Sequence, residues 1–211
     1  MEFTGIIISL VLAYILRNKD LNRILKLLFL YFAFSEVFKQ TVLFKLNGYY
    51  DFWYFPFQLC SLPLYLIPLY FLSKKKYFLN FLSDFCLLGG ICAFIDTSGM
   101  HYDFSILTIN SYLWHYLLIV TGMVIKFDVK DEDFRYEMMV YLISIVIATV
   151  INLLFQDANM FYISPYHRMN QLVFRDISIY LGQNFTKLFY CFMQLTGAYF
   201  INRLCNFFIK M

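Results

Sequence analysis

The stretch WYFPFQLCSLPLYLIPLYFL, residues 53–72, decides how the chain is expected to fold. It is long and apolar enough to cross a bilayer as a helix, yet it holds three of the four prolines, Pro56, Pro63 and Pro68. Each proline removes a backbone donor and crowds the carbonyl one turn back, so the helix should kink and leave carbonyl groups unpaired. Lipid cannot satisfy such groups, so the kinked segment must pack against protein or line a cavity. We therefore expect a buried polar pocket at Cys60.

The composition is that of an integral membrane protein. Of 211 residues, 61% are hydrophobic and 15% are charged, which is too little polar surface for a soluble globule of this size. The net charge is +3, and Lys and Arg cluster between the apolar runs, so nucleic acid is not an expected partner. The five cysteines form no C-x-x-C pair, which argues against a disulfide framework and a zinc site. We expect no cofactor.

Apolar runs of about 20 residues predict an all-α integral membrane protein with a seven-helix transmembrane bundle. The N-terminus has no cationic region, so the first run is expected to remain as a span rather than act as a signal peptide. No repeat or linker interrupts the chain, so we expect one domain, residues 1–211. The predicted spans are Phe3–Leu16, Ile24–Leu46, Trp53–Leu72, Tyr77–Ile95, Phe104–Ile125, Glu137–Phe155 and Phe185–Phe207.

The distribution of Lys and Arg predicts the orientation of the bundle. They flank the first connection, fill the third at residues 74–76 and recur in the fifth, whereas the alternate connections are poorer in them. Because positively charged connections stay in the cytoplasm, we predict the N-terminus outside and the C-terminus in the cytoplasm. The long sixth connection, residues 156–184, interleaves apolar residues with Arg175 and Asp176, which indicates a helix lying in the membrane interface.

Polar side chains inside the spans indicate one wet cavity, because such groups are costly in lipid and face the bundle interior. At the helical rise per residue, Cys60 lies roughly 10 Å and His115 roughly 17 Å below the outer surface, a difference within the range of tilt and side-chain reach. Further polar residues fall in the same outer half or at mid-depth: Glu36, Lys39, Gln40, Gln58, Asn110, Asn152 and Gln194.

A thiol and an imidazole in one pocket can carry nucleophilic catalysis. The imidazole of His115 can take the proton of Cys60 and hold a thiolate, which suits acyl transfer because a thioester can pass its acyl group to an alcohol. Gln58, Asn110 or Asn152 can orient the imidazole or donate to an oxyanion. The alternative is packing, since membrane cysteines usually act as small hydrophobes and a lone intramembrane histidine often bonds a carbonyl of a neighbouring helix.

Other polar residues favour structural roles. Glu36, Lys39 and Gln40 are one turn apart, and a structural ion pair is preferred over a proton relay. Asp84 is expected to accept an interhelical hydrogen bond. The turn at residues 96–103 gathers two carboxylates and a histidine, but its spacing matches no defined metal site, so we expect a polar turn.

Several motifs resemble a known family. They are Phe57-Gln58-Leu59-Cys60-Ser61-Leu62-Pro63, Gly89-Gly90-Ile91-Cys92-Ala93-Phe94 and Asn159-Met160-Phe161-Tyr162, together with His115 and Asn152. With them the chain resembles the YwaF-like integral membrane family of bacteria, which is related to the eukaryotic acyltransferase called transmembrane protein 164. The resemblance implies a seven-span bundle in a bacterial cell membrane and acyl transfer among phospholipids through Cys60 and His115.

The chain also departs from that pattern. Gln58 stands where many relatives have His, Asp96 where many have Pro, and the Gly-Pro-Trp-Pro ending of the last span is missing. The Gly89-Gly90 pair removes side-chain bulk and is expected to let span four approach the kinked span three closely. The departures from the family pattern leave Cys60 and His115 in place, but they change residues around this pair and bear on which substrate is used.

The leading hypothesis is a membrane-embedded lipid acyltransferase or acyl hydrolase that works through a thioester on Cys60. Its substrate would be a phospholipid or lysophospholipid, and the sequence specifies no oligomeric state. One alternative is a non-enzymatic small-molecule binding or transport component, and another is a helix-packing partner. The expected substrate contacts are Gln58, Asn110, Asn152, Glu36 and Gln194.

Overall fold

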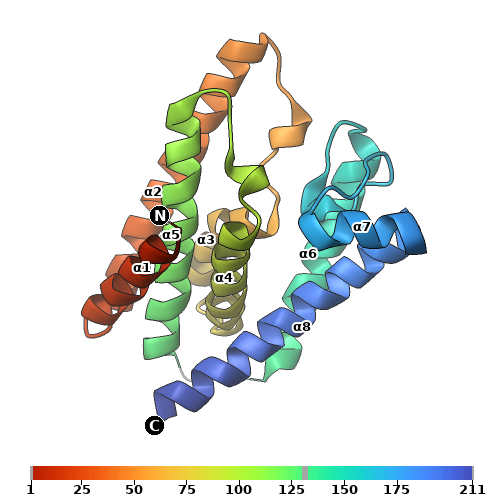
Figure 1. Ribbon diagram of the computed structural model, residues 1–211. Coiled ribbons are helices and arrows are strands. Elements are labelled where there is room, and N and C mark those ends of the chain that lie inside the picture. The colour runs from red at the N-terminus through yellow and green to blue at the C-terminus, as the bar shows by residue number, and fades with distance from the viewer. Residues whose placement is uncertain (1, 130–132, 211) are drawn as a thin grey trace.

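The computed structural model describes residues 2–129 and 133–210, and within them every regular element is a helix (Figure 1). The predicted all-α fold is therefore confirmed. Short 3₁₀ turns stand at residues 52–54, 59–61, 97–100 and 160–162. The α-helices are α1 (Glu2–Leu16), α2 (Leu21–Asn47), α3 (Pro63–Ser73), α4 (Tyr77–Ile95), α5 (Ser105–Asp128), α6 (Phe134–Leu154), α7 (Leu172–Leu181) and α8 (Gln183–Lys210).

The predicted count of seven spans is not supported. Among the described residues, only α2, α4, α5 and α6 are both long and apolar enough to cross a membrane. The apolar helices α1 and α3 are shorter, with 15 and 11 residues. Placing the two termini on opposite sides of the membrane requires an odd number of crossings besides the distribution of Lys and Arg, so that orientation is not supported either. The single domain stays a prediction.

The segment expected to be one kinked span, residues 53–72, is broken more thoroughly than a kink. Two 3₁₀ turns occupy residues 52–54 and 59–61, with irregular chain at Pro56 between them. Pro63 opens α3, where its missing N–H has no helical partner to lose, and Pro68 lies inside this short helix. The prolines therefore shorten the span to a half-length helix that follows a non-helical entry.

Local capping fixes where the long helices begin and end. The Asp20 side chain accepts the N–H of Asn22 at 3.0 Å and starts α2, and Gly48, with φ of 75°, ends it. The connection expected to hold an interfacial helix does contain a helix, α7, which lies crosswise to α5 in Figure 1, and its place in the membrane interface stays a prediction. α7 is the extra helix that the count of apolar runs did not include as a span.

Helix α4 lies among α3, α5, α6 and α8 and is buried over most of its length. Its closest packing is against α5. A Cβ atom on Gly90 would lie 2.7 Å from the Ile119 side chain, and one on Gly122 would lie 2.6 Å from the carbonyl oxygen of Ser83. Gly90 of the Gly-Gly pair thus permits a close approach to α5, whereas we expected the approach to be to the kinked span.

A buried polar cluster ties α4, α5 and α8 together. Lys126 Nζ lies 2.9 Å from the Asp84 carboxylate, and the two side chains are 4% and 0% exposed. Asn202 Nδ2 donates to the other Asp84 oxygen at 2.9 Å. The expectation that Asp84 accepts an interhelical hydrogen bond is confirmed. We call Asp84, Lys126 and Asn202 the closed cluster.

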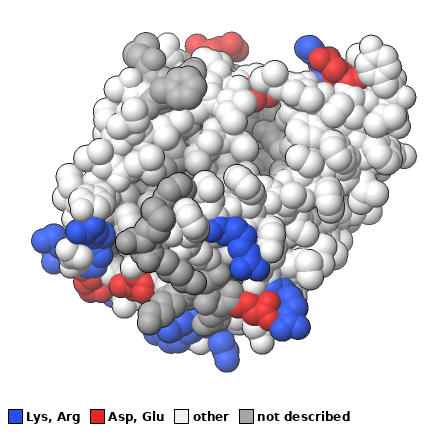
Figure 2. All heavy atoms as spheres, turned by 60° about the horizontal axis from the view of Figure 1, so that its bottom comes forward, with Lys and Arg blue, Asp and Glu red and all other residues white. Residues whose placement is uncertain are grey.

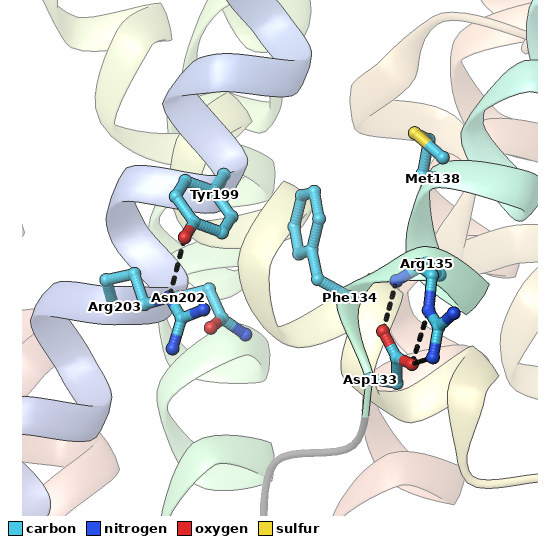
Figure 3. Close-up of a pocket in the computed structure, with 7 residues that line it drawn as sticks. All are labelled: Asp133, Phe134, Arg135, Met138, Tyr199, Asn202 and Arg203. Atoms are coloured by element: carbon cyan, nitrogen blue, oxygen red, sulfur yellow. Dashed lines mark hydrogen bonds and ion pairs between the residues drawn. The ribbon is translucent and has the colours of Figure 1, made fainter.

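The cations gather at one end of the molecule (Figure 2). This end, which we call the basic end, contains the connections after α1, α3 and α5 and the C-terminus of α8 (Figure 1). Arg17, Lys19 and residues 74–76 lie on it. A cavity of about 440 Å³ opens there between α6 and α8 (Figure 3).

Candidate functional site

A larger cavity, of about 770 Å³, lies in the opposite half of the molecule, beside the broken segment. Its walls come from the C-terminal halves of α2 and α4, the N-terminal halves of α5 and α8, and the connections around them. This volume is in the range of cavities that hold small molecules. We call it the main cavity.

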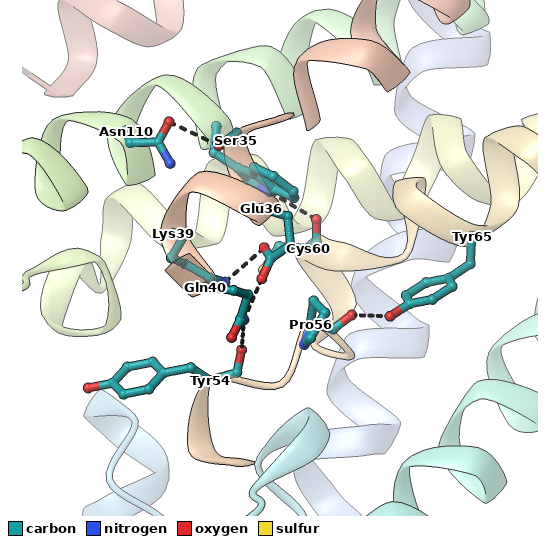
Figure 4. A network of polar contacts seen from close by, with 10 residues as sticks. Ser35, Glu36, Lys39, Gln40, Tyr54, Pro56, Cys60, Tyr65 and Asn110 are labelled. Atoms are coloured by element: carbon teal, nitrogen blue, oxygen red, sulfur yellow. Dashed lines mark hydrogen bonds and ion pairs between the residues drawn. The ribbon is translucent and has the colours of Figure 1, made fainter. Parts of the chain in front are cut away.

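The carbonyl groups released by the broken segment are satisfied by side chains of neighbouring helices (Figure 4). The carbonyl oxygens of Tyr54, Pro56 and Cys60 accept hydrogen bonds from Gln40 Nε2 (2.6 Å), the Tyr65 hydroxyl (2.9 Å) and Trp114 Nε1 (3.0 Å), respectively. Side chains of α2, α3 and α5 thereby hold the segment that carries Cys60. The irregular backbone is buried in protein, as a broken helix in lipid requires.

Most of the predicted site residues meet at the main cavity. Its lining includes Cys60, His115, Gln58, Asn110, Glu36 and Gln194. Asn152 is fully buried and does not line the cavity. The predicted residues that line the cavity therefore come from four separate segments that the fold places around one space.

His115 is held in a defined orientation on α5. Its Nδ1 lies 2.7 Å from the carbonyl oxygen of Ser111, one turn back. A carbonyl oxygen can only accept, so in the neutral imidazole Nδ1 carries the proton and Nε2 carries the lone pair. Trp114, the preceding residue, donates to the backbone of Cys60 at 3.0 Å, so the thiol segment and the imidazole are fixed to the same turn of α5.

The thiol and the imidazole do not bond directly. Within residues 2–129 and 133–210, no hydrogen bond joins Cys60 Sγ to His115, and both side chains are half-buried in the cavity wall. Lys39 lines the same cavity. The two groups therefore face a shared space that a bound molecule or water can occupy.

Gln58 and Asn152 hold backbone rather than the imidazole. Gln58 Nε2 donates to the Asn159 carbonyl at 2.8 Å, and its Oε1 accepts the N–H of Phe161 at 2.8 Å. Asn152 makes the same pair of bonds with Met160, at 3.0 and 2.7 Å. Both amides are thus engaged in clamping residues 159–161.

The clamped turn has an unusual backbone. Phe161 and Tyr162 have φ of 54° and 59°, a left-handed conformation that side-chain-bearing residues adopt only when their surroundings impose it. The two amide clamps supply that constraint. The result is that Tyr162 lines the main cavity.

Asn110 and Gln194 also have partners. Asn110 Oδ1 accepts from the Ser35 hydroxyl at 2.9 Å and the Tyr31 hydroxyl at 3.3 Å, which leaves its NH₂ group without a hydrogen-bond partner among the described residues. Gln194 Oε1 accepts from the Tyr141 hydroxyl at 2.7 Å. Asn110 therefore has an uncommitted donor in the lining.

The ion pair expected on α2 is confirmed. Lys39 Nζ lies 2.8 Å from Glu36 Oε2, and Gln40 Nε2 donates to Glu36 Oε1 at 2.6 Å (Figure 4). The side chains of Lys39 and Glu36 are 18% and 9% exposed, because this group borders the main cavity. We call Glu36, Lys39 and Gln40 the open cluster.

Asp96 fastens α7 at the edge of the main cavity. Its Oδ2 accepts the N–H of Leu172 at 3.1 Å, and its Oδ1 accepts from the backbone and hydroxyl of Ser98 at 3.1 and 2.6 Å. Partial burial raises the pKa of Asp96, but these hydrogen bonds outweigh it and hold that pKa below its ordinary value. Asp96, which stands where many relatives have Pro, therefore serves here to hold the start of α7.

Sequence reasoning did not select several lining residues. Trp114, Tyr162, Arg168 and Cys92 border the main cavity. Tyr162 and Arg168 lie in the connection after α6, whose path no periodicity predicts. Trp114 carried a usable signal, because it directly precedes the intramembrane histidine.

Comparison with known proteins identifies the family. Neither the curated proteins nor the solved structures give a significant match to this chain. The predicted relation to transmembrane protein 164 is confirmed, whereas the YwaF-like label is not. The model of the TMEM164 family matches residues 2–200, and together with the four apolar helices it identifies a membrane protein. The chain therefore belongs to the TMEM164 family.

Proposed function

We propose that this protein is a membrane-embedded acyltransferase that moves an acyl chain between lipids, with Cys60 as nucleophile and His115 as proton carrier. One observation carries the proposal: Cys60 and His115 line the same cavity of about 770 Å³, and the bond to Ser111 leaves Nε2 of His115 free for proton transfer. A base must be within reach of the proton directly or through one water, and the geometry of an empty site tightens when substrate binds.

The chemistry runs in two balanced halves. His115 Nε2 takes the proton of the Cys60 thiol, and the thiolate attacks the carbonyl carbon of a lipid ester. The ester C–O bond breaks, the leaving alkoxide takes the proton from the imidazolium, and a thioester remains on Cys60. An acceptor alcohol then gives its proton to His115 and attacks the thioester, which releases the new ester and restores the thiol.

Two lining groups support this path. The free NH₂ group of Asn110 is the proposed donor to the oxyanion or to the substrate, since its oxygen is already occupied. Lys39, fixed by Glu36, supplies positive charge near the thiolate that forms. Gln194 is the proposed contact on the α8 side. Gln58 and Asn152 contribute by holding the turn at residues 159–161.

The proposed substrate is a phospholipid or lysophospholipid of the membrane. Leu59, Leu88 and Leu107 give the main cavity apolar walls that suit an acyl chain, while the polar groups named above face the ester. We also propose that the basic end faces the cytoplasm, which the gathering of Lys and Arg there supports. A reporter fused to the C-terminus should then be cytoplasmic, and an extracytoplasmic signal would contradict this orientation.

A non-enzymatic binder is the second candidate. The separation of thiol and imidazole by the cavity favours it, because a pocket that only holds a solute needs no bond between them. In that case saturable solute binding would survive the Cys60→Ser substitution and no acyl group would be found on the protein.

The decisive experiment is acyl transfer in reconstituted vesicles. Purified protein is mixed with a phospholipid and an isotope-labelled lysophospholipid, and the products are measured by mass spectrometry. Cys60→Ala should reduce transfer to background and abolish a hydroxylamine-sensitive acyl group on the protein. Cys92→Ala is the matched control, because Cys92 lines the same cavity and should be dispensable. Full transfer by the Cys60→Ala protein would remove the proposal.

An assay with the phospholipid but without the acceptor distinguishes a transferase from a hydrolase. In vesicles that lack lysophospholipid, a transferase should accumulate the thioester and release little fatty acid. Steady release of fatty acid would instead assign hydrolysis to the same residues.

A further inference from the structure

The basic end contains a cavity that acyl transfer at Cys60 does not use. It has a volume of about 440 Å³ and lies between the first turn of α6 and the last turns of α8 (Figure 3). Two arginines, Arg135 and Arg203, line it, and Phe134, Met138 and Tyr199 supply its apolar walls. We call it the basic-end cavity. It combines two cations, the Asp133 carboxylate and apolar surface in one open cavity.

Tyr199 fixes the guanidinium group of Arg203 in an orientation that can bind an anion. Its Nε donates to the Tyr199 hydroxyl at 3.0 Å, and its guanidinium carbon lies 5.0 Å from the centre of that ring. No carboxylate lies within ion-pair distance of Arg203 in residues 2–129 and 133–210. Both contacts leave the terminal NH₂ groups available, and this planar pair matches two oxygens of a phosphate.

Arg135 stands on the other side of Phe134 (Figure 3). It pairs with Asp133, and its side chain is 82% exposed, so it can turn to a ligand without losing a buried contact. Phe134 packs edge-on against Tyr199, with ring centres 5.2 Å apart. This contact packs the start of α6 against α8, and the two arginines lie on either side of it.

The level of the cavity matches that of lipid headgroups. It lies where the apolar helices α4, α5 and α6 begin or end, and other cations such as Arg17 and Lys19 share this end. Basic pockets between membrane helices on the cytoplasmic side bind anionic headgroups. The aromatic and thioether walls suit the glycerol and first methylenes of a lipid, which a soluble anion would leave exposed to water.

We propose that the basic-end cavity binds the phosphate-bearing headgroup of an anionic phospholipid, with Arg203 as its main ligand and Arg135 as the second. The site is separate from the main cavity and does not depend on Cys60. Asn202, which also lines it, donates to Asp84 of the closed cluster at 2.9 Å. A lipid bound here therefore also stabilises the packing of α8 against α4.

The test is lipid binding by the full-length protein in phosphatidylcholine nanodiscs with increasing phosphatidylglycerol, read by native mass spectrometry. Arg203→Gln should lower the affinity for phosphatidylglycerol about tenfold, because it removes a two-pronged charged contact. The matched control is Arg17→Gln. Arg17 also lies over a tyrosine at the basic end, 3.9 Å from the Tyr14 ring centre, but it lines neither cavity described here. Its loss should change affinity less than about twofold.

Two further measurements keep the test informative. Tyr199→Phe keeps the ring and removes only the hydroxyl that orients Arg203, so it should weaken binding about two- to threefold even if Arg203→Gln folds poorly. Cys60→Ala should bind phosphatidylglycerol like the unaltered chain, which separates this site from the proposed catalysis.

Three outcomes would overturn the proposal. Equal losses in Arg203→Gln and Arg17→Gln would mean attraction by the whole basic surface rather than a site. Displacement of phosphatidylglycerol by millimolar inorganic phosphate would assign the cavity to a soluble anion. Equal affinity for phosphatidylcholine would show that headgroup charge is not recognised.

Discussion

The open cluster and the closed cluster contain the same chemistry in different surroundings. Each pairs a lysine with a carboxylate at under 3 Å, at 2.8 Å for Lys39 and Glu36 and at 2.9 Å for Lys126 and Asp84. The closed pair joins two helices and is almost completely buried, whereas the open pair lies within one helix and borders the main cavity. The comparison teaches that burial and topology, rather than residue type, separate a polar group that holds the fold from one available to a ligand.

The largest effect should come from His115, which lines the main cavity beside the open cluster. His115→Gln removes the proposed proton carrier and, if the proposed acyl transfer holds, should lower its rate about 10²- to 10⁴-fold. The resistance to unfolding should change little, because the ring bonds only a carbonyl of its own helix. Transfer rates and an SDS unfolding titration on the same sample measure both. A variant that unfolds early while its residual rate is normal would place His115 with the structural residues.

The next effect concerns the closed cluster. Lys126→Met leaves the Asp84 carboxylate buried without its cation and should lower the free energy of unfolding by about 3–5 kcal/mol. SDS titration followed by circular dichroism measures this loss. A change below about 1 kcal/mol would mean that the buried carboxylate finds another partner, and the distinction between the clusters would fail.

Lys39→Met is the matched substitution in the open cluster. Glu36 keeps its bond from Gln40 and borders the cavity, so the free energy of unfolding should fall by only about 1 kcal/mol or less. The same titration measures it beside Lys126→Met. A loss as large as that of Lys126→Met would show that the open cluster also holds the fold.

The most local effect concerns Asp96 and the docking of α7. Because its folded-state pKa lies below its ordinary value of 3.8, its contribution is full above pH 3.8 and disappears as the pH falls through the folded-state pKa. Asp96→Asn should cost about 0.5–1.5 kcal/mol locally and remove that pH dependence. Hydrogen exchange of the peptide containing residues 172–181 reports it. Unchanged protection in Asp96→Asn would mean that α7 docks through its apolar contacts alone.

Much of the site could be predicted from the sequence because it lies where local rules are strongest. Pro56 and Pro63 cannot sit in a regular span, so a broken segment at Cys60 and a cavity beside it follow from backbone chemistry. Likewise, Glu36 and Lys39 are one turn apart on one helix, and their ion pair needs no knowledge of the fold. His115 is polar and deep in an apolar run, which assigns it to the interior.

The errors arose where the outcome depends on packing between distant segments. The partner of Gly90 is α5, and no feature of the Gly-Gly pair itself selects one neighbour over another. Gln58 and Asn152 clamp a turn in the connection after α6, whose path has no periodic pattern to predict it. The count of seven spans is not supported, and for α3 the reason is that hydropathy alone does not show how short a proline-broken helix becomes.

Gly89 and Gly90, adjacent in sequence, differ in what they allow. Gly90 is fixed by the close approach of α5, whereas a methyl group added to Gly89 would meet no atom within 4 Å and would project into the main cavity. Alanine at position 89 would thus reduce the volume of the main cavity, and it also favours the helix. Under the proposed acyl transfer, this one position would limit the length of the acyl chain without repacking the bundle.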